Sequence, residues 1–219
     1  MSEQIPYDPG HWRISNVQHR GRTLIVDLLD SLLLARTQEQ AGVHARANPN
    51  GFTTRDLPMY FAVFRALEKQ HQMGIDVSTP VAFIRTSMRK KHLLTLTAVD
   101  YSPKGKSVVT YGVGTEKPYQ QKVDVVGHDR RIAQKDSARL EALLGIGNVE
   151  EINRVFRFIN GTPVYLRKVD AKPLEADRRV AGVDADYAKA YLDCGGELWG
   201  IYPALGIREV TPLRGARKR

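Results

Sequence analysis

The chain contains one cysteine and none of the short motifs that identify common enzyme classes. Cys194 alone excludes an internal disulfide and a cysteine-based zinc site, which is typical of a reducing compartment, with the cytoplasm as the default. We find no G-x-x-x-x-G-K-S/T, G-x-G-x-x-G, H-E-x-x-H or G-x-S-x-G. The six histidines are scattered without ligand spacing. The sequence therefore predicts no metal site, no cofactor and no catalytic residue, and it favours a non-enzymatic protein.

Long apolar segments are also missing. Residues 1–10 show no charged segment followed by an apolar one, so we expect no signal peptide. The longest apolar stretch, residues 23–35, is interrupted by Asp27, Asp30 and Ser31 and is too short to span a bilayer. The 42% of hydrophobic residues in 219 still suffice for a normal core, in one large domain or two small ones.

Acidic residues are fewer than basic ones, and this imbalance favours an acidic partner. Lysine and arginine number 33 against 24 aspartates and glutamates, which gives a net charge of +9. The excess is concentrated between residues 85 and 122, where only Asp100 and Glu116 oppose the cations, and at residues 214–219, which contain no acid. Each phosphate that a lysine or arginine neutralises releases a condensed counterion. Nucleic acid is therefore the leading predicted partner.

The pattern of apolar residues predicts an α+β fold whose N-terminal half is helical. After an N-terminal arm at residues 1–22 with a short strand at 12–17, apolar residues with a period near 3.6 indicate a helix from Thr23 to before Gly42. A module at residues 23–126 combines helices with a β-ribbon, a C-terminal α/β portion follows at 127–213, and residues 214–219 form a basic tail. Within the module we expect helices from Thr54 or Asp56 to Gly74 and at 81–91, and strands at 93–101, 107–113 and 119–126.

The order of elements between Asp56 and Val113 is a helix, a short connection, a basic helix and a β-ribbon, which resembles a winged helix. In that interpretation the helix at 81–91 enters the major groove of duplex DNA and the ribbon follows the backbone. The alternative is a β-meander in which residues 81–86 form a strand beside the ribbon. The candidate nucleic-acid contacts are the cations and one histidine of these segments, of the helix at 148–159 and of the tail: Arg85, Arg89, Lys90, Lys91, His92, Lys104, Lys106, Lys117, Lys122, Arg154, Arg157, Arg217, Lys218 and Arg219.

The C-terminal portion begins with two predicted helices, at 136–144 and 148–159. The turn Leu144-Gly-Ile-Gly147 between them resembles the helix-hairpin-helix motif of DNA-binding proteins, but Glu151 stands where that motif has a small residue. A plain αα-hairpin is the alternative. A small mixed sheet is expected to follow, with strands at 162–169, 197–202 and 207–211 and a helix at 184–194.

Several functions are compatible with these patterns. The first is a duplex-DNA-binding regulator or a replication or mobile-element accessory protein, and the second is an RNA-binding subunit of a bacterial ribonucleoprotein defence complex. The RNA alternative predicts that aromatic residues line the basic face for stacking on bases, and the candidates are Tyr101, Tyr111, Tyr119 and Trp199. A metal-dependent nuclease would use carboxylates such as Asp100, Glu116 and Asp124 beside Lys117 or Lys122. A scaffold that binds an acidic protein, in a protein complex or a homo-oligomer, is a further alternative.

Overall fold

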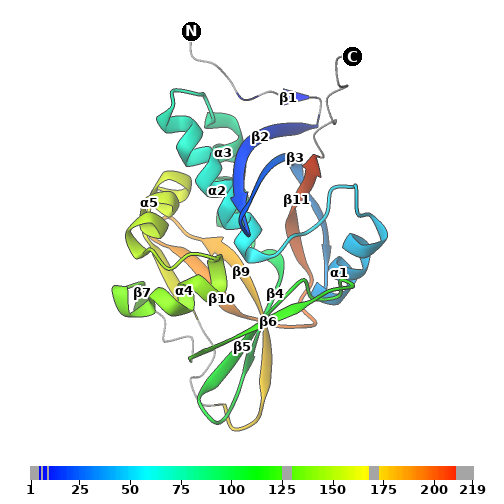
Figure 1. Cartoon of the computed structure of the whole chain (residues 1–219), viewed down its shortest axis with the longest axis vertical. Helices are drawn as coiled ribbons and strands as arrows, with labels where there is room; N and C mark the ends of the chain where they lie inside the picture. The colour runs from blue at the N-terminus through cyan, green and yellow to red at the C-terminus, as the bar shows by residue number, and fades with distance from the viewer. Residues whose placement is uncertain (1–4, 6, 9, 125–129, 168–172, 211–219) are drawn as a thin grey trace, which may run out of the picture.

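The computed structural model describes residues 5, 7–8, 10–124, 130–167 and 173–210. Two β-sheets and interleaved helices form the fold (Figure 1). The larger sheet has seven strands in the order β6-β5-β4-β9-β10-β8-β7, and the smaller has the order β1-β2-β3-β11. The strands are β1 (Tyr7–Asp8), β2 (His11–His19), β3 (Arg22–Arg36), β4 (Leu93–Tyr101), β5 (Lys106–Tyr111), β6 (Tyr119–Asp124), β7 (Arg130–Arg131), β8 (Val164–Arg167), β9 (Asp177–Ala185), β10 (Ala190–Gly196) and β11 (Tyr202–Val210). The helices are α1 (Gln38–Ala47), α2 (Leu57–Gln72), α3 (Ser78–Lys90), the short 3-10 helix η1 (Gln134–Asp136), α4 (Ser137–Leu144) and α5 (Val149–Asn160).

The smaller sheet brings an early strand and the last described strand together. Strands β2 and β3 are joined by the turn Arg20-Gly21, whose residues have φ values of 50° and 71°. Positive φ at both positions is what a two-residue hairpin turn of this kind requires. Strand β11 then pairs antiparallel with β3, with Leu205 opposite Leu32 and Ile207 opposite Leu28.

Helix α2 connects the two sheets through a buried tyrosine. The Asp56 side chain accepts a hydrogen bond from the Met59 N–H and so caps the first turn of α2. The fully buried Tyr60 hydroxyl donates to the Leu94 carbonyl of β4 (2.9 Å) and accepts from the Leu205 N–H of β11 (2.9 Å). Burial raises the pKa of Tyr60, so this hydroxyl remains a donor.

The prediction of a helical N-terminal half is wrong, because the segment at 23–35 forms most of the long strand β3. Leu24, Leu28 and Leu32 imitate a helical period, but β3 is buried on both faces near Leu28, where alternation is lost. Register shifts between β3 and β11 disturb the alternation further. Helices and strands therefore interleave along the chain.

A second predicted helix, at 184–194, is also wrong. These residues end β9 and begin β10, and the turn between the two strands is held by the Asp186 carboxylate, which accepts from the N–H groups of Ala188 (2.7 Å) and Lys189 (2.6 Å). The expected strand at 197–202 is a turn up to residue 201. Local hydrogen bonds of aspartate stabilise such turns, and apolar periodicity does not detect them.

Other expectations are confirmed element by element. The strand at 12–17 lies within β2, the helices from Asp56 and at 81–91 correspond to α2 and α3, and the helices at 136–144 and 148–159 correspond to α4 and α5, each of which packs on α2. Since 81–86 is helical, the β-meander is wrong. The winged helix is wrong as well, because β4 pairs with β9 as well as with β5 and the ribbon belongs to the larger sheet. None of the described helices has the length and apolar character that crossing a membrane requires.

Candidate nucleic-acid interface

Two of the predicted contact residues, Arg85 and Arg89, are occupied inside the protein. Arg85 donates from Nε to the Ile159 carbonyl (2.6 Å) and from Nη2 to the Phe158 carbonyl (3.1 Å). Arg89 donates to the side chain (2.9 Å) and the backbone carbonyl (2.7 Å) of Asn160. The last carbonyls of a helix lack partners within the helix and carry its negative dipole end. Both arginines therefore cap the C-terminal end of α5 and hold α3 against it.

The remaining predicted residues outside the ribbon lie in different places. Arg154 is paired with Glu68 (2.8 Å) on α2, while Arg157 is exposed on α5. Lys90 and Lys91 are exposed at the end of α3 and line a cavity that is described below. Residues Arg217, Lys218 and Arg219 lie outside the described part of the chain.

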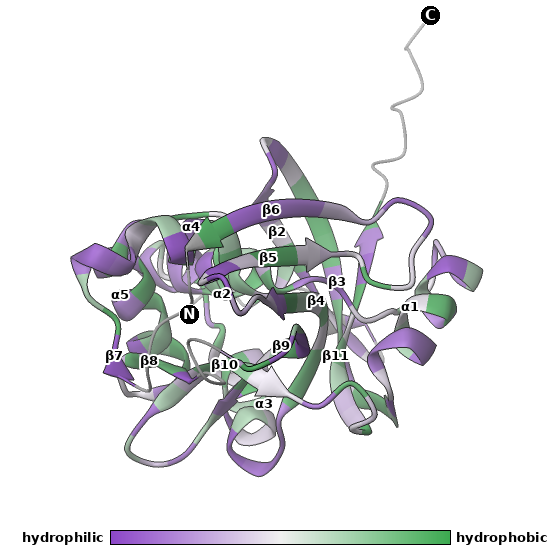
Figure 2. Cartoon of the chain, turned by 90° about the horizontal axis from the view of Figure 1, so that it is seen from below, coloured by the Kyte–Doolittle hydropathy of each residue, from purple (hydrophilic) through white to green (hydrophobic). Residues whose placement is uncertain are grey.

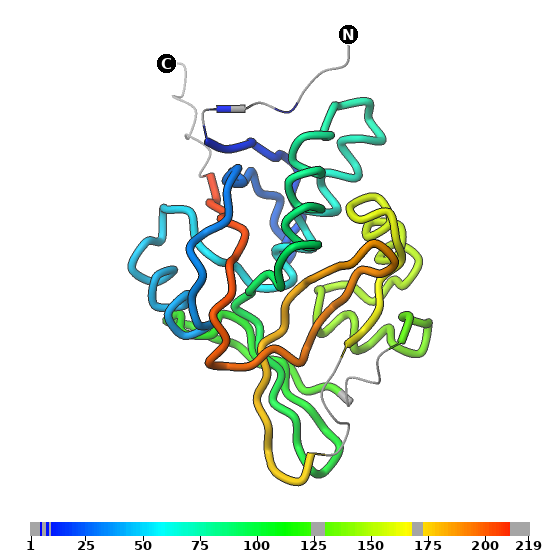
Figure 3. The backbone as a smooth tube through the Cα atoms, turned by 180° about the vertical axis from the view of Figure 1, so that it is seen from behind, coloured from blue at the N-terminus to red at the C-terminus, as the bar shows by residue number. Residues whose placement is uncertain are grey.

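The lower ends of β4, β5 and β9 extend beyond the helices, as Figures 1 and 3 show from opposite sides. Lys104 is exposed in the turn at this tip. Strand pairing places Arg178, Asp100, Val108 and Lys122 side by side across β9, β4, β5 and β6, hence on one face of the sheet.

Because side chains alternate along a strand, Lys106 and Thr110 lie on the same face as Val108, and Gln120 lies on the same face as Lys122. We call this surface the ribbon face; it comprises Asp100, Lys106, Val108, Thr110, Gln120, Lys122 and Arg178. Viewed from below, β6 is largely hydrophilic (Figure 2).

A polar network orders the ribbon face and offsets its one described acid. Arg178 Nε lies 3.6 Å from Asp100 Oδ1, and the Thr110 hydroxyl donates to Asp100 Oδ2 at 3.2 Å. Gln120 donates in turn to the Thr110 hydroxyl at 3.3 Å. Lys106 and Lys122 are exposed and form no ion pair within the described part of the chain. The face therefore presents two exposed lysines, of which Lys106 stands opposite Asp124 in the strand register.

The four candidate aromatic residues divide into two buried and two exposed side chains. Tyr101 and Tyr111 are each 2% exposed, and the hydroxyl of Tyr101 donates to the Cys194 carbonyl at 3.0 Å. Tyr119 is 40% exposed and Trp199 is 70% exposed. Both line a hollow of about 860 Å³ together with ribbon-face residues Thr110, Gln120 and Arg178. An exposed indole thus lies beside the ribbon face.

The ring of Tyr119 is held in place by contacts with Tyr111 and Arg20. Its ring stacks on Tyr111 with centroids 4.2 Å apart and planes 14° apart, and the Arg20 guanidinium lies 4.1 Å from its centroid. Arg20 is itself paired with Asp56. Burial raises the pKa of Tyr119, so its hydroxyl stays neutral. The exposed part of this ring therefore forms a rigid edge of the hollow.

The carboxylates suggested for a nuclease are not gathered at the ribbon face. Asp100 is engaged by Arg178 and Thr110, whereas Glu116 lies beyond the far end of β5 and lines another cavity with Lys117 and Arg55. The side chain of Asp124 lies outside what the structure describes. Among the described carboxylates, Asp100 and Glu116 therefore do not share a two-metal site, which needs carboxylates around ions about 4 Å apart.

One cluster has the residue types of a metal site but is occupied by a guanidinium. Ligand atoms of His92, Asp184 and Asp193 lie within 4.8 Å of one another. Arg167 Nη1 lies 3.2 Å from an oxygen of each carboxylate, and His92 Nδ1 lies 3.7 Å from Asp193. A metal ion would have to displace Arg167 from these oxygens. The cluster therefore acts as an ion-pair network that joins β8, β9 and β10 to the start of β4. His92, one of the predicted nucleic-acid contacts, belongs to this network.

No protein-family model, curated protein or solved structure matches the chain. Sequence reasoning missed Arg178 and the hollow beside Trp199, because both depend on strand register across β4, β5, β6 and β9. The turn dipeptides around Trp199 were the one local signal that this residue lies outside the core.

Proposed function

We propose that the protein binds single-stranded nucleic acid, RNA or single-stranded DNA, on the ribbon face. The observation that carries the proposal is the exposed Trp199, which lines a hollow with Thr110, Gln120 and Arg178 of the face that also bears Lys106 and Lys122. Lysines that track a phosphate backbone and aromatic rings on which bases stack are the two components of single-strand binding. The net charge of +9 supports an anionic polymer as the ligand.

A single strand suits this surface better than a duplex does. Bases can stack on Trp199 only when they are unpaired, and the ring edge of Tyr119 bounds the same hollow. The helix expected to enter a major groove is unsuited to that role, because Arg85 and Arg89 bind the end of α5. An RNA-binding or single-stranded-DNA-binding subunit of a larger assembly would use the ribbon face to hold a strand.

The test is a comparison of labelled single-stranded RNA, single-stranded DNA and duplex DNA by fluorescence anisotropy. Trp199→Ala should weaken single-strand binding by about tenfold, since stacking contributes about 1–3 kcal/mol per base. Lys106→Gln with Lys122→Gln should also weaken it. The matched control is Lys69→Gln with Lys135→Gln, which removes the same charge from exposed positions on α2 and η1 and should leave affinity unchanged.

Two outcomes would overturn the proposal. If duplex DNA binds more tightly than both single strands, the single-strand assignment is wrong. If none of the three polymers binds at low salt, the ribbon face does not serve nucleic acid, and an acidic protein partner becomes the explanation of the charge.

A further inference from the structure

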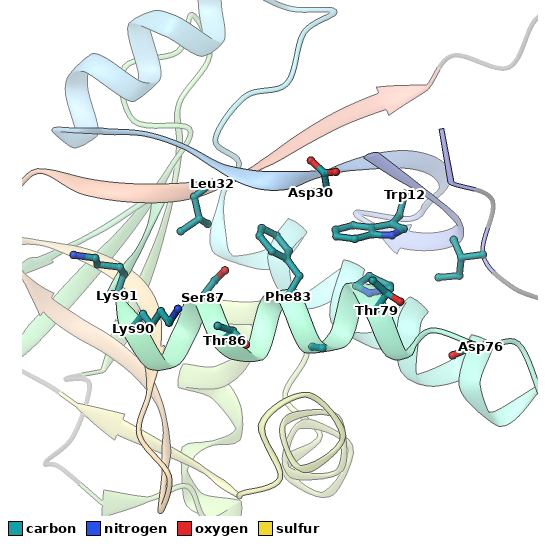
Figure 4. A pocket seen from close by; sticks show the side chains of 13 residues that line it. Trp12, Asp30, Leu32, Asp76, Thr79, Phe83, Thr86, Ser87, Lys90 and Lys91 are labelled. Atoms are coloured by element: carbon teal, nitrogen blue, oxygen red, sulfur yellow. The ribbon is translucent and has the colours of Figure 1, made fainter. Parts of the chain in front are cut away.

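A second cavity lies between α3 and the strands β2 and β3, on a different part of the molecule from the ribbon face (Figure 4). Its volume of about 990 Å³ is within the size range of small-molecule sites. Lys91 lies two residues before β4 and Lys104 three residues after it, so the nine residues of β4, about 26 Å long at 3.3 Å per residue, separate this cavity from the tip of the ribbon. We call it the α3 cavity.

One end of the α3 cavity is cationic. Lys90 and Lys91 lie there at the C-terminal end of α3, beside the hydroxyl groups of Thr86 and Ser87 (Figure 4). Both lysines are exposed and form no ion pair with any residue that the structure describes. In Figure 4 the Lys90 ammonium lies near the Ser87 hydroxyl, whereas the Lys91 ammonium points away from it. Lysine binds phosphate as a point charge, and two such charges outweigh the partial negative charge at the C-terminal end of α3, so this end is suited to a phosphate group.

The middle of the cavity is apolar and aromatic. Trp12 from β2 and Phe83 from α3 meet across it with ring centroids 5.5 Å apart and planes inclined by 44°. Leu32 on β3 borders the same space (Figure 4). Flat, apolar ligand surfaces such as a nucleobase gain from contact with rings of this kind.

A carboxylate completes the set of groups. Asp30 on β3 lines the cavity near Phe83 and Trp12, and Asp76 lies at the end away from the lysines (Figure 4). A carboxylate accepts hydrogen bonds from the hydroxyls of a ribose or the N–H groups of a base. Asp30 and Asp76 each have an interaction within the protein, and a carboxylate with one partner still has lone pairs that can accept from a ligand.

We infer that the α3 cavity binds a nucleotide. Its phosphate would contact Lys90 and Lys91, its base would pack against Phe83 and Trp12, and Asp30 would accept from the base or the ribose. Along α3, Phe83 and Lys90 are separated by about 10 Å, at 1.5 Å per residue, which is comparable with the length of an extended mononucleotide. The nucleotide is either free or the phosphorylated end of a strand.

The two tryptophans of the chain allow this site to be observed separately from the ribbon face. In Trp199→Phe, Trp12 is the remaining tryptophan, and its fluorescence reports on the α3 cavity. The probes are adenosine 5′-monophosphate, adenosine and ribose 5-phosphate, titrated with parallel calorimetry. We expect a saturable change with the monophosphate, weaker binding of adenosine and the weakest binding of ribose 5-phosphate.

Substitutions then separate the phosphate contacts from the base contacts. Lys90→Gln with Lys91→Gln should lower the affinity for the monophosphate by about tenfold or more, since hydrogen bonds to charged groups contribute about 1.5–3 kcal/mol. The same substitutions should leave the affinity for adenosine unchanged. Phe83→Leu should lower the affinity for both ligands. The matched control, Lys106→Gln with Lys122→Gln, should bind the monophosphate as the parent does, although it loses affinity for strands.

Competition distinguishes the two sources of the nucleotide. Displacement of the monophosphate by a 5′-phosphorylated oligonucleotide, but not by the unphosphorylated one, would assign the site to a strand end. Displacement by neither would assign it to a free nucleotide. The inference is overturned if no probe gives a saturable change in folded protein, as checked by circular dichroism, or if ribose 5-phosphate binds as tightly as the monophosphate. Neither overturning result depends on whether strands bind the ribbon face.

Discussion

The salt dependence of strand binding measures how many phosphates the ribbon face contacts. Lys104, Lys106 and Lys122 are the exposed lysines at and beside this face. If each neutralises one phosphate, log K should fall with log salt with a slope of about −2, from about −0.7 per phosphate. A fourfold rise in salt concentration should then lower affinity by about 20-fold. The double variant Lys106→Gln with Lys122→Gln keeps one of these lysines, so its slope of log K against log salt should be about −0.7. The same fourfold rise in salt should then lower its affinity by about threefold.

The assay is fluorescence anisotropy of a labelled single strand across a series of potassium chloride concentrations. Trp199→Ala serves as the informative comparison, because it should lower affinity at every salt concentration without changing the slope. A double variant with the slope of the parent would show that these lysines do not contact phosphate. The placement of the strand on the ribbon face would then be wrong, even if the protein binds nucleic acid.

Three further predictions concern the interior of the fold. Tyr60→Phe should lower the free energy of unfolding by about 1–3 kcal/mol, because the Leu205 N–H and the Leu94 carbonyl both lose their hydrogen-bond partner. An unchanged midpoint of urea unfolding would contradict the role of Tyr60 as a bridge between the two sheets. Arg89→Gln should destabilise the protein by about 1.5–3 kcal/mol yet leave strand affinity unchanged, whereas a large loss of affinity would restore α3 as the binding helix. Burial opposes ionisation of Asp27, but hydrogen bonds from arginines, including one of 2.6 Å from Arg208, hold the pKa of this carboxyl below its usual value. Because the pKa of Asp27 is lower in the folded than in the unfolded state, the ionised carboxylate stabilises the fold above the unfolded-state pKa of about 4, and this stability is lost as the pH falls through the folded-state pKa. The free energy of unfolding of Asp27→Asn should therefore fall less steeply in acid than that of the parent. Equal slopes of unfolding free energy against pH would refute this linkage.

Local end signals made several elements predictable. Helix α2 begins where Asp56 and Pro58 provide a cap and a first-turn proline, and α5 begins where Asn148 accepts from the Glu151 N–H at 3.0 Å. These signals need only neighbouring residues. The strand β3 lacks them, and its apolar run is explained by β2 and β11, which are distant in sequence. A pattern within one segment cannot report burial that other segments provide.

The candidate site shows the same division. Lysine content and turn residues located Lys104 and Lys106 on a ribbon, because a hairpin is a local structure. The partners of Arg85 and Arg89 lie in α5, more than seventy residues further along the chain, and charge in the sequence does not reveal them. In the same way, Arg178 joins Asp100 only through the pairing of β9 with β4.

The pairing of β3 with β11 has a consequence for how the chain is made. During synthesis, β2 and β3 leave the ribosome early, but β3 can gain its second neighbour only after residue 210 has been translated. Until then β3 is an open edge with apolar side chains, and such edges invite pairing with other chains. We therefore expect nascent chains that stop before β11 to aggregate or to recruit chaperones, whereas chains that extend beyond it should become soluble in one late step.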